Sequence, residues 1–270
     1  MIKNNLFSNK PLVISALHLP PLYARNDYSI ARLEDYVLKN IEVFVKGGIP
    51  AVILQDETMS DSTARPETIA VMSALGSLIR HEFPVLDLGI IIEAHDAIAP
   101  IAIAHACDAS FVRIKVFVGA MLKSSGIKNG CGINAVDYRN KLGSENIQIL
   151  SDVHDRTGYP MIDVPIDKAS KWAVNTGADG IILTGMDYDQ SLTYIKNVRE
   201  SGVNRPILMG GSVTEENVRE VLSIADGVIV SSSLKKDIAE AGDVIKWDLD
   251  KVRRFMDVAA AQSGDGSGTG

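Results

Sequence analysis

The strongest constraint on the fold is a series of short apolar runs that recur along the whole chain. Their apolar residues follow one another without alternation, which is typical of strands buried on both faces of a parallel sheet. The runs cover residues 11–17, 50–54, 88–92, 111–118, 147–150, 180–183, 205–209 and 226–230.

Amphipathic stretches with a helical period separate these runs. Pro66 and Asp248 mark helix starts, whereas Gly177 and Gly202 mark helix ends. The helical stretches cover roughly residues 30–46, 66–82, 97–107, 134–142, 166–177, 190–201, 214–223 and 248–260. This alternation predicts an α/β fold, a (β/α)8 TIM barrel in a single domain over residues 1–262. The alternative is an open doubly wound sheet, which usually has fewer strands and an early glycine fingerprint that is absent here.

Composition and charge exclude several classes of partner and cellular location. The net charge is −7 over 270 residues, and no basic run is interleaved with aromatic residues, so we expect no nucleic-acid partner. The first residues lack the apolar core of a signal peptide, and no run could span a membrane, so we expect a cytoplasmic protein without membrane insertion. We also expect a homo-oligomer. Cys107 and Cys131 give neither a disulfide framework nor a zinc spacing. Residues 263–270 are predicted to form a disordered tail.

Active sites of TIM barrels lie at the carboxyl ends of the strands, so the residues after each apolar run are the candidates. The first five runs are followed by, or contain, ionisable groups, and these are the predicted catalytic residues: His18, Asp56, Glu93, Arg113, Lys115, Asp152 and His154. The last three runs end in glycine and hydroxyl residues, which favour binding of a phosphate on backbone amides. The predicted phosphate-binding residues are Thr184, Gly185, Gly210, Gly211, Ser212, Ser232 and Ser233.

Strand alternation predicts which candidates share a face. Arg113 and Lys115 lie two positions apart, as do Asp152 and His154. A lone buried cation costs several kcal/mol, so Arg113 and Lys115 are predicted to face a polar cavity with acidic neighbours; a structural ion-pair layer is the alternative. Asp152 and His154 are predicted to be the acid/base or metal-binding pair, with Glu93 as a second carboxylate.

Several roles stay open at this point. Lys115 is expected to meet the reacting oxygen as a cation, or else to act as a Schiff-base nucleophile. No cofactor is firmly implied, although Glu93, His95, Asp152 and His154 are the ligand types of a divalent metal. His18 could simply end a strand, and Asp56 could cap the next helix.

Residues 118–133 form a long connection rich in glycine and serine. Functional lids have this composition, and so do ordinary loops. Lys123 and Lys128 would meet an anionic substrate if this segment closed over it.

Several segments resemble one known family. "ALHLPPL" near the start, "FVRIKVFVGA", "DVHDRTGYP", "GADGIILTG", "GGSVTEENV" and "ADGVIVSSSLKKD" are similar to segments of the BtpA/SgcQ family, over about residues 11–257. The resemblance implies a TIM barrel related to ribulose-phosphate-binding barrels, and the family name comes from a proposed role in photosystem I biogenesis. Lys115 stands where that family typically has Asn, and Arg156-Thr157 where it has Lys-His.

Two classes of function follow. The first is an enzyme of carbohydrate metabolism that acts on a phosphorylated sugar or related metabolite by acid/base chemistry, as an isomerase, epimerase, lyase or hydrolase. The second is a non-catalytic biogenesis or stability factor for a membrane complex, which predicts an exposed docking surface. The many ionisable groups at one barrel mouth favour the enzyme.

Overall fold

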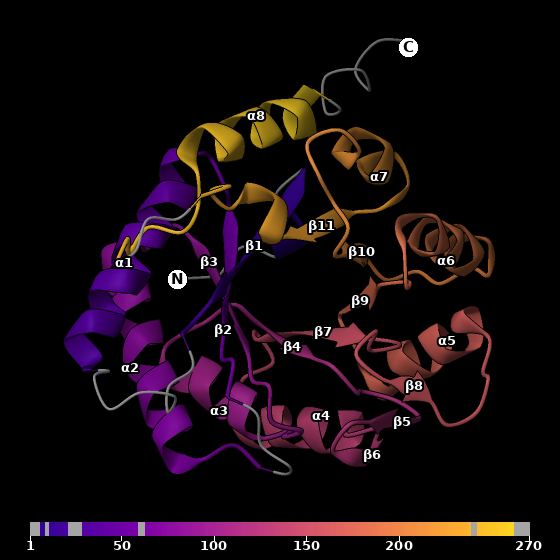
Figure 1. Ribbon diagram of the computed structural model, residues 1–270. Coiled ribbons are helices and arrows are strands. Elements are labelled where there is room, and N and C mark those ends of the chain that lie inside the picture. Colours follow the sequence, from indigo (N-terminus) through magenta and orange to yellow (C-terminus); the bar gives the residue numbers. More distant parts are fainter. Residues whose placement is uncertain (1–5, 9–10, 21–28, 59–62, 239–241, 262–270) are drawn as a thin grey trace.

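The computed structural model describes residues 6–8, 11–20, 29–58, 63–238 and 242–261. Its centre is a closed barrel of parallel strands in the order β1-β11-β10-β9-β7-β4-β3-β2 (Figure 1). The barrel strands are β1 (Leu12–His18), β2 (Ala51–Gln55), β3 (Asp87–Ile91), β4 (Phe111–Ile114), β7 (Gln148–Asp152), β9 (Gly180–Leu183), β10 (Ile207–Gly210) and β11 (Gly227–Val230). The predicted TIM barrel is confirmed, and closure of the sheet rules out the doubly wound alternative.

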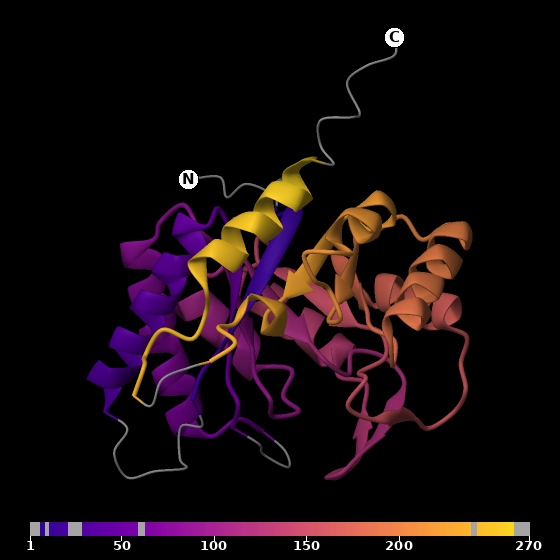
Figure 2. The same cartoon turned by 45° about the horizontal axis from the view of Figure 1, so that its top comes forward.

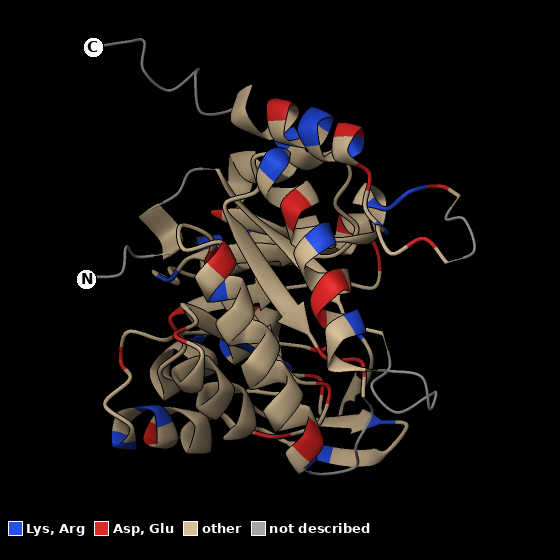
Figure 3. Cartoon of the chain, turned by 90° about the vertical axis from the view of Figure 1, so that its left-hand side faces the viewer, with Lys and Arg blue, Asp and Glu red and all other residues tan. Residues whose placement is uncertain are grey.

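Helices surround the barrel, one after each strand. They are α1 (Ile30–Lys46), α2 (Pro66–Glu82), α3 (Ala99–Ala106), α4 (Gly132–Lys141), α5 (Ile166–Thr176), α6 (Tyr188–Glu200), α7 (Val218–Ile224) and α8 (Leu249–Ala260). Acidic and basic residues are interspersed along the outer helices on the side shown in Figure 3. The helix predicted at 214–223 begins later, because the Asn217 side chain accepts a bond from the Thr214 amide and closes a turn there.

Alternation along each strand divides the apolar core in two. One set of side chains packs between strands and helices, and the other fills the barrel. In β1, for example, Leu12, Ile14 and Ala16 belong to the interior set, whereas Val13 and Leu17 pack against the helices. The interior set therefore defines which positions of each strand point to the barrel axis.

The segment 118–133 is not an ordinary irregular loop, and its role as a lid stays a prediction. Strands β5 (Ala120–Lys123) and β6 (Gly126–Asn129) form an antiparallel hairpin, and β8 (Tyr159–Pro160) pairs with β5. Gly126 has φ +95°, a conformation that favours glycine and allows the tight turn. The hairpin stands out from the body of the barrel (Figure 2).

The tail predicted for residues 263–270 lies outside the described residues. Within the part of the chain that the structure describes, no helix is both long and apolar enough to cross a membrane.

Close packing inside the barrel generates a stability prediction. A methyl group on Gly89 would collide with the ring of Phe111, which is fully buried. We expect Gly89→Ala to lower the free energy of unfolding by about 1–3 kcal/mol, because the ring has to move in a packed interior. Phe111→Leu removes the obstacle, so the double variant should lose less stability than the sum of the single variants.

Denaturant unfolding of the four proteins measures this coupling. Val85→Ala is the control, because Val85 is 92% exposed and its truncation should change stability by less than about 0.5 kcal/mol. Additive losses in the double variant would contradict the proposed collision.

Candidate active site

A layer of polar residues closes the apolar interior at the barrel mouth. Each strand has a last apolar residue that points into the barrel. Because side chains alternate, the residue two positions later also points inward. These positions, one from each strand, are His18, Gln55, Glu93, Arg113, Asp152, Thr184, Gly210 and Ser231. The first five strands thus supply ionisable or amide side chains, and the last three supply hydroxyl groups and glycine.

An ion pair between Arg113 and Asp152 lies at the centre of this layer. Arg113 donates from Nε to Oδ2 and from Nη2 to Oδ1 of Asp152, both over 2.9 Å. Their side chains are 18% and 3% exposed. Burial raises the pKa of Asp152, while Arg113 acts in the opposite direction. Since a guanidinium does not lose its proton in proteins, we take the pair to be ionic, which gives Arg113 the predicted acidic neighbour.

A second network connects strands β1 to β4. Lys115 donates to Glu93 Oε1 over 2.5 Å. Gln55 Nε2 donates to the same Glu93 oxygen over 3.2 Å and to Glu57 Oε1 over 3.1 Å. His18 Nδ1 donates to Glu57 Oε1 over 2.6 Å, and this bond lowers the pKa of Glu57. Gln55 and Glu57 therefore join the predicted residues His18, Glu93 and Lys115 in one connected set.

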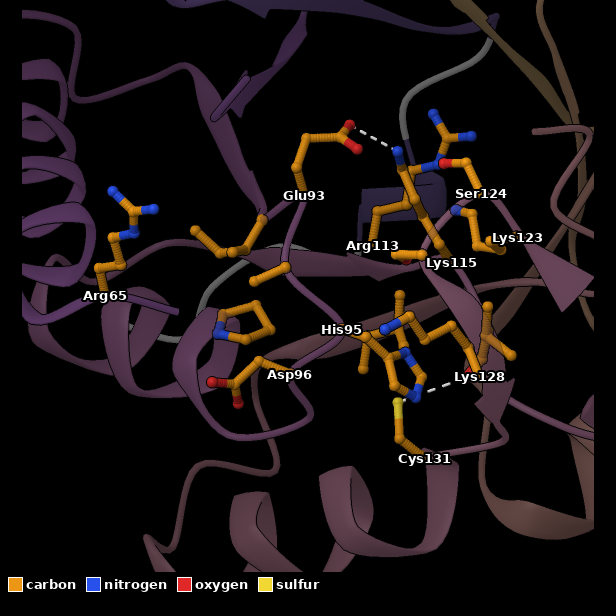
Figure 4. A pocket seen from close by; sticks show the side chains of 16 residues that line it. Arg65, Glu93, His95, Asp96, Arg113, Lys115, Lys123, Ser124, Lys128 and Cys131 are labelled. Atoms are coloured by element: carbon orange, nitrogen blue, oxygen red, sulfur yellow. Dashed lines mark hydrogen bonds and ion pairs between the residues drawn. The ribbon is translucent and has the colours of Figure 1, made fainter. Parts of the chain in front are cut away.

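A cavity of about 410 Å3, called the mouth cavity below, opens beside Glu93 and Lys115 (Figure 4). It is lined by Arg65, Ile92, Glu93, Ala94, His95, Asp96, Pro100, Arg113, Ile114, Lys115, Val116, Lys123, Ser124, Ser125, Lys128 and Cys131. Arg113 and Lys115 both face this cavity, as alternation predicts, although β4 already ends at Ile114.

His95 faces the mouth cavity as a neutral base. Its Nε2 donates to the carbonyl of Asn129 over 2.8 Å, so Nδ1 carries no proton in the neutral ring. Burial lowers the pKa of His95, and the ammonium groups of Lys128 and Lys123 lower it further.

We call residues 210–212 and 232–233, in the loops after β10 and β11, the anion cup, after the phosphate that the sequence predicts there. Gly211 and Ser212 have φ values of +80° and +57°, so the chain makes a left-handed turn directly after the strand. Within the described chain, the amide N–H groups of Ser212, Ser232 and Ser233 make no hydrogen bond. Unbonded amides in such turns are donors for an anion.

Two arginines lie against this cup. An added Cβ on Gly211 would be 2.9 Å from Nη1 of Arg156, and one on Gly210 would be 3.8 Å from Nη2 of Arg113. Arg156 is exposed and makes no ion pair among the described residues. Its position after the fifth apolar run indicates the barrel mouth, but only the fold reveals its proximity to residue 211.

The other predicted phosphate-binding residues differ in whether their donors are free to bind a ligand. Thr184 Oγ1 is buried and has no hydrogen-bond partner in the described structure, and it would lie 2.5 Å from a Cβ on Gly210. The Gly185 amide is already bonded to Ser191 Oγ, and Ser233 Oγ donates to the Val213 carbonyl. Gly185 is thus required for close approach of α6 rather than as a donor.

The structure does not form the predicted pair of Asp152 and His154. Strand β7 ends at Asp152, the chain bends, and His154 lines a separate cavity of about 290 Å3 with apolar neighbours that include Val153 and Trp172. Alternation holds only while the backbone stays extended, so it fails one residue beyond the strand. Burial lowers the pKa of His154 in this apolar cavity.

Asp56 does not line the mouth cavity either. Its side chain is fully buried, and Oδ1 accepts a bond from the Thr58 amide over 2.8 Å. Its Oδ2 has no hydrogen-bond partner within the described residues, and burial raises the pKa of Asp56. Asp56 is therefore a buried residue that does not reach the mouth cavity, in contrast to its predicted catalytic role.

The described residues contain no group of three or more His, Cys, Asp or Glu side chains that could hold a metal ion. The carboxylates of Glu93 and Asp152 are engaged by Lys115 and Arg113, and His154 lies in the other cavity. The alternative of a metal held by Glu93, His95, Asp152 and His154 therefore does not fit this arrangement.

Solved structures share the barrel architecture. The 3-hexulose-6-phosphate synthase from Salmonella typhimurium matches with a TM-score of 0.57 at 13% identity, covering 93% of this chain and 99% of that chain. The phosphoribosyl anthranilate isomerase from Thermus thermophilus matches with a TM-score of 0.55 at 12% identity, covering 92% and 98%. At these identities the likeness establishes the fold alone.

Sequence relatives establish the family. A Methanocaldococcus jannaschii protein described as uncharacterized is 30% identical, covering 94% of this chain and 97% of its own. The photosystem I biogenesis protein BtpA of Synechocystis is 28% identical, covering 87% and 84%, and the putative sgc region protein SgcQ of Escherichia coli is 28% identical, covering 78% of each chain. The model of the BtpA family matches residues 8–261, so the chain belongs to the BtpA family.

Proposed function

We propose that the protein is an enzyme that binds a phosphorylated sugar or a related small metabolite and transfers protons at the barrel mouth. The observation that carries the proposal is the position of the Arg156 guanidinium, which has no ion-pair partner among the described residues, over Gly211 and beside unbonded amides of the anion cup. Two structures of similar fold are named as a hexulose phosphate synthase and a phosphoribosyl anthranilate isomerase, which supports a phosphorylated substrate.

The phosphate would bind in the anion cup. The amides of Ser212, Ser232 and Ser233 donate to its oxygens, and Arg156 supplies a planar guanidinium suited to phosphate. Thr184 contributes a buried hydroxyl that lacks a partner within the described residues. Arg113 links this end to the mouth cavity, because it lies near Gly210 and also lines that cavity.

Proton transfer would take place beside Glu93 and Lys115. The ion pair orients the Lys115 ammonium toward the cavity, where it donates to an oxygen that gains negative charge during the reaction. An ammonium held by a carboxylate suits this role better than that of a Schiff-base nucleophile, which needs a neutral amine. His18 and Glu57 extend the acid/base set across the mouth, and Asp152 holds Arg113 in place.

The second candidate function is a non-catalytic assembly factor, as the name of the Synechocystis relative suggests. Exposed apolar side chains around the β5–β6–β8 sheet favour it, namely Leu122, Ile127, Tyr159, Met161 and Ile162. This candidate leaves the buried ion pairs at the mouth without a purpose, so we prefer the enzyme.

The anion cup can be tested with a matched pair of variants. We expect D-fructose 6-phosphate to raise the Tm of the wild type. Gly211→Asp introduces a carboxylate into the cup, so it should abolish this increase. Gly202→Asp is the control, because Gly202 has a similar φ of +81° and nothing within 4 Å of an added Cβ. Arg156→Met should weaken binding by about tenfold to a hundredfold. Equal ligand-induced shifts in Gly211→Asp and Gly202→Asp would exclude phosphate binding at the cup.

The chemistry can be tested without knowing the substrate. Pentose and hexose phosphates are incubated with the enzyme in D2O, and 1H and 31P NMR follow deuterium uptake and any conversion. Lys115→Met and Glu93→Gln should slow the reaction of the responsive compound by about 10²–10⁴-fold, because each removes a group of the acid/base set. Binding of that compound should persist, since the anion cup is intact.

Lys39→Met, which changes an exposed lysine of α1, controls for the loss of charge alone. A rate in Lys115→Met equal to that of the wild type would remove Lys115 from the mechanism. No turnover with any compound of the panel would favour the assembly factor.

A further inference from the structure

The β5–β6 hairpin turns its lysine side chains inward and its apolar side chains toward solvent. Strand pairing sets Met121 opposite Lys128, so alternation places Lys123 and Lys128 on one face and Leu122 and Ile127 on the other. The lysine face is turned inward: Lys128 is 8% exposed, and the Lys123 side chain 18%. Leu122 and Ile127 are 48% and 56% exposed. An ordinary surface hairpin has the reverse arrangement, so the lysines of this hairpin face the interior of the molecule rather than bulk solvent.

The inner side of the hairpin is a wall of the mouth cavity. Lys123 and Lys128 both line it, and Figure 4 shows them on the side of the pocket opposite Arg65. Five cationic side chains line the cavity against two carboxylates, those of Glu93 and Asp96. The cavity therefore has an excess of positive charge on a protein whose net charge is −7.

Two carboxylates near the hairpin are held by bonds within the protein, and one of them, Asp155, already pairs with the hairpin residue Lys123. Asp96 accepts bonds from the amides of Ala64, Ile98 and Ala99, which fix the start of α3. Asp155 pairs with Lys123 over 2.5 Å and also accepts two bonds from Thr157.

The other polar groups on this wall can also receive an anion. The hydroxyl groups of Ser124 and Ser125, in the turn of the hairpin, line the same cavity. Burial and the ammonium groups of Lys128 and Lys123 lower the pKa of His95, so the ring is neutral and adds no charge to this wall.

We propose that the inner face of the hairpin, with Lys128 as its buried cation, binds a second anionic group of the substrate. This inference rests on the proposed function and extends it to the substrate class: a small metabolite with a phosphate at one end and a carboxylate or second phosphate at the other. The phosphate end occupies the anion cup after β10 and β11. The second anion lies against Lys128, Lys123 and the turn serines, and Arg113 and Lys115 lie between the two ends.

The experiment compares ligands that differ by one anionic group. Calorimetry measures Kd for D-fructose 6-phosphate, D-fructose 1,6-bisphosphate and 6-phospho-D-gluconate. At least one of the two ligands with a second anionic group should bind the wild type about tenfold to a hundredfold more tightly than the monophosphate, as expected for added charge-assisted hydrogen bonds. The ligand that binds more tightly than the monophosphate identifies the second anionic group as phosphate or carboxylate.

Variants assign that gain to the hairpin. Lys128→Gln should abolish the gain and leave Kd for D-fructose 6-phosphate unchanged, whereas Lys128→Arg should keep it. Ser125→Asp adds a negative charge at an exposed position of the turn, so it should also abolish the gain without disturbing a buried residue. Lys39→Gln, which removes an exposed charge from α1, should behave as the wild type.

The outcomes separate the two proposals. Equal affinity of the wild type for all three ligands, or an equal loss for all three in Lys128→Gln and Ser125→Asp, would overturn the second subsite. Binding of D-fructose 6-phosphate that survives Gly211→Asp would instead overturn the anion cup, and with it the proposed function.

Discussion

The bidentate ion pair of Arg113 and Asp152 is the interaction on which the barrel mouth depends. It joins neighbouring strands β4 and β7 directly above the apolar interior, and both side chains are largely withdrawn from water. Removal of either partner would leave an uncompensated charge, at a cost of about 3–5 kcal/mol. Because Arg113 also approaches Gly210 and lines the mouth cavity, the pair lies between the anion cup and the residues Glu93 and Lys115.

Charge is distributed unevenly around the mouth, and this asymmetry has a physical basis. The strands from β1 to β7 deliver groups that satisfy one another as ion pairs and bridging hydrogen bonds, such as Lys115 with Glu93 and His18 with Glu57. The strands from β9 to β11 deliver backbone donors and a buried hydroxyl without protein partners among the described residues. The buried hydroxyl of Thr184 costs free energy while it lacks a partner, and the amides of the exposed residues Ser212 and Ser232 are open to water or to a ligand, so this half of the mouth is suited to a ligand.

Strand alternation predicted the direction of side chains correctly where the backbone stays extended and wrongly where it bends. Arg113, Lys115 and Glu93 face the mouth cavity as strand alternation requires. Alternation predicts the same direction for His154, but the chain bends after Asp152, and the ring of His154 lies in an apolar cavity. Gln55 satisfies the inward alternation but was not among the predicted residues, because an amide lacks the chemical signal of an acid or base. Only the tertiary structure places the Arg156 side chain beside Gly211.

The sequence by itself predicted the barrel, since eight apolar runs that alternate with helical stretches favour a closed parallel sheet over an open one. It also determined that glycine and hydroxyl groups follow the last strands, because those residues are local to the chain. The tertiary structure alone decided which charges pair, which histidine faces the cavity, and that residues 118–133 fold as a hairpin with its lysines inward. These features depend on distances between segments far apart in sequence, and a one-residue change in where a strand ends reverses the direction of a side chain.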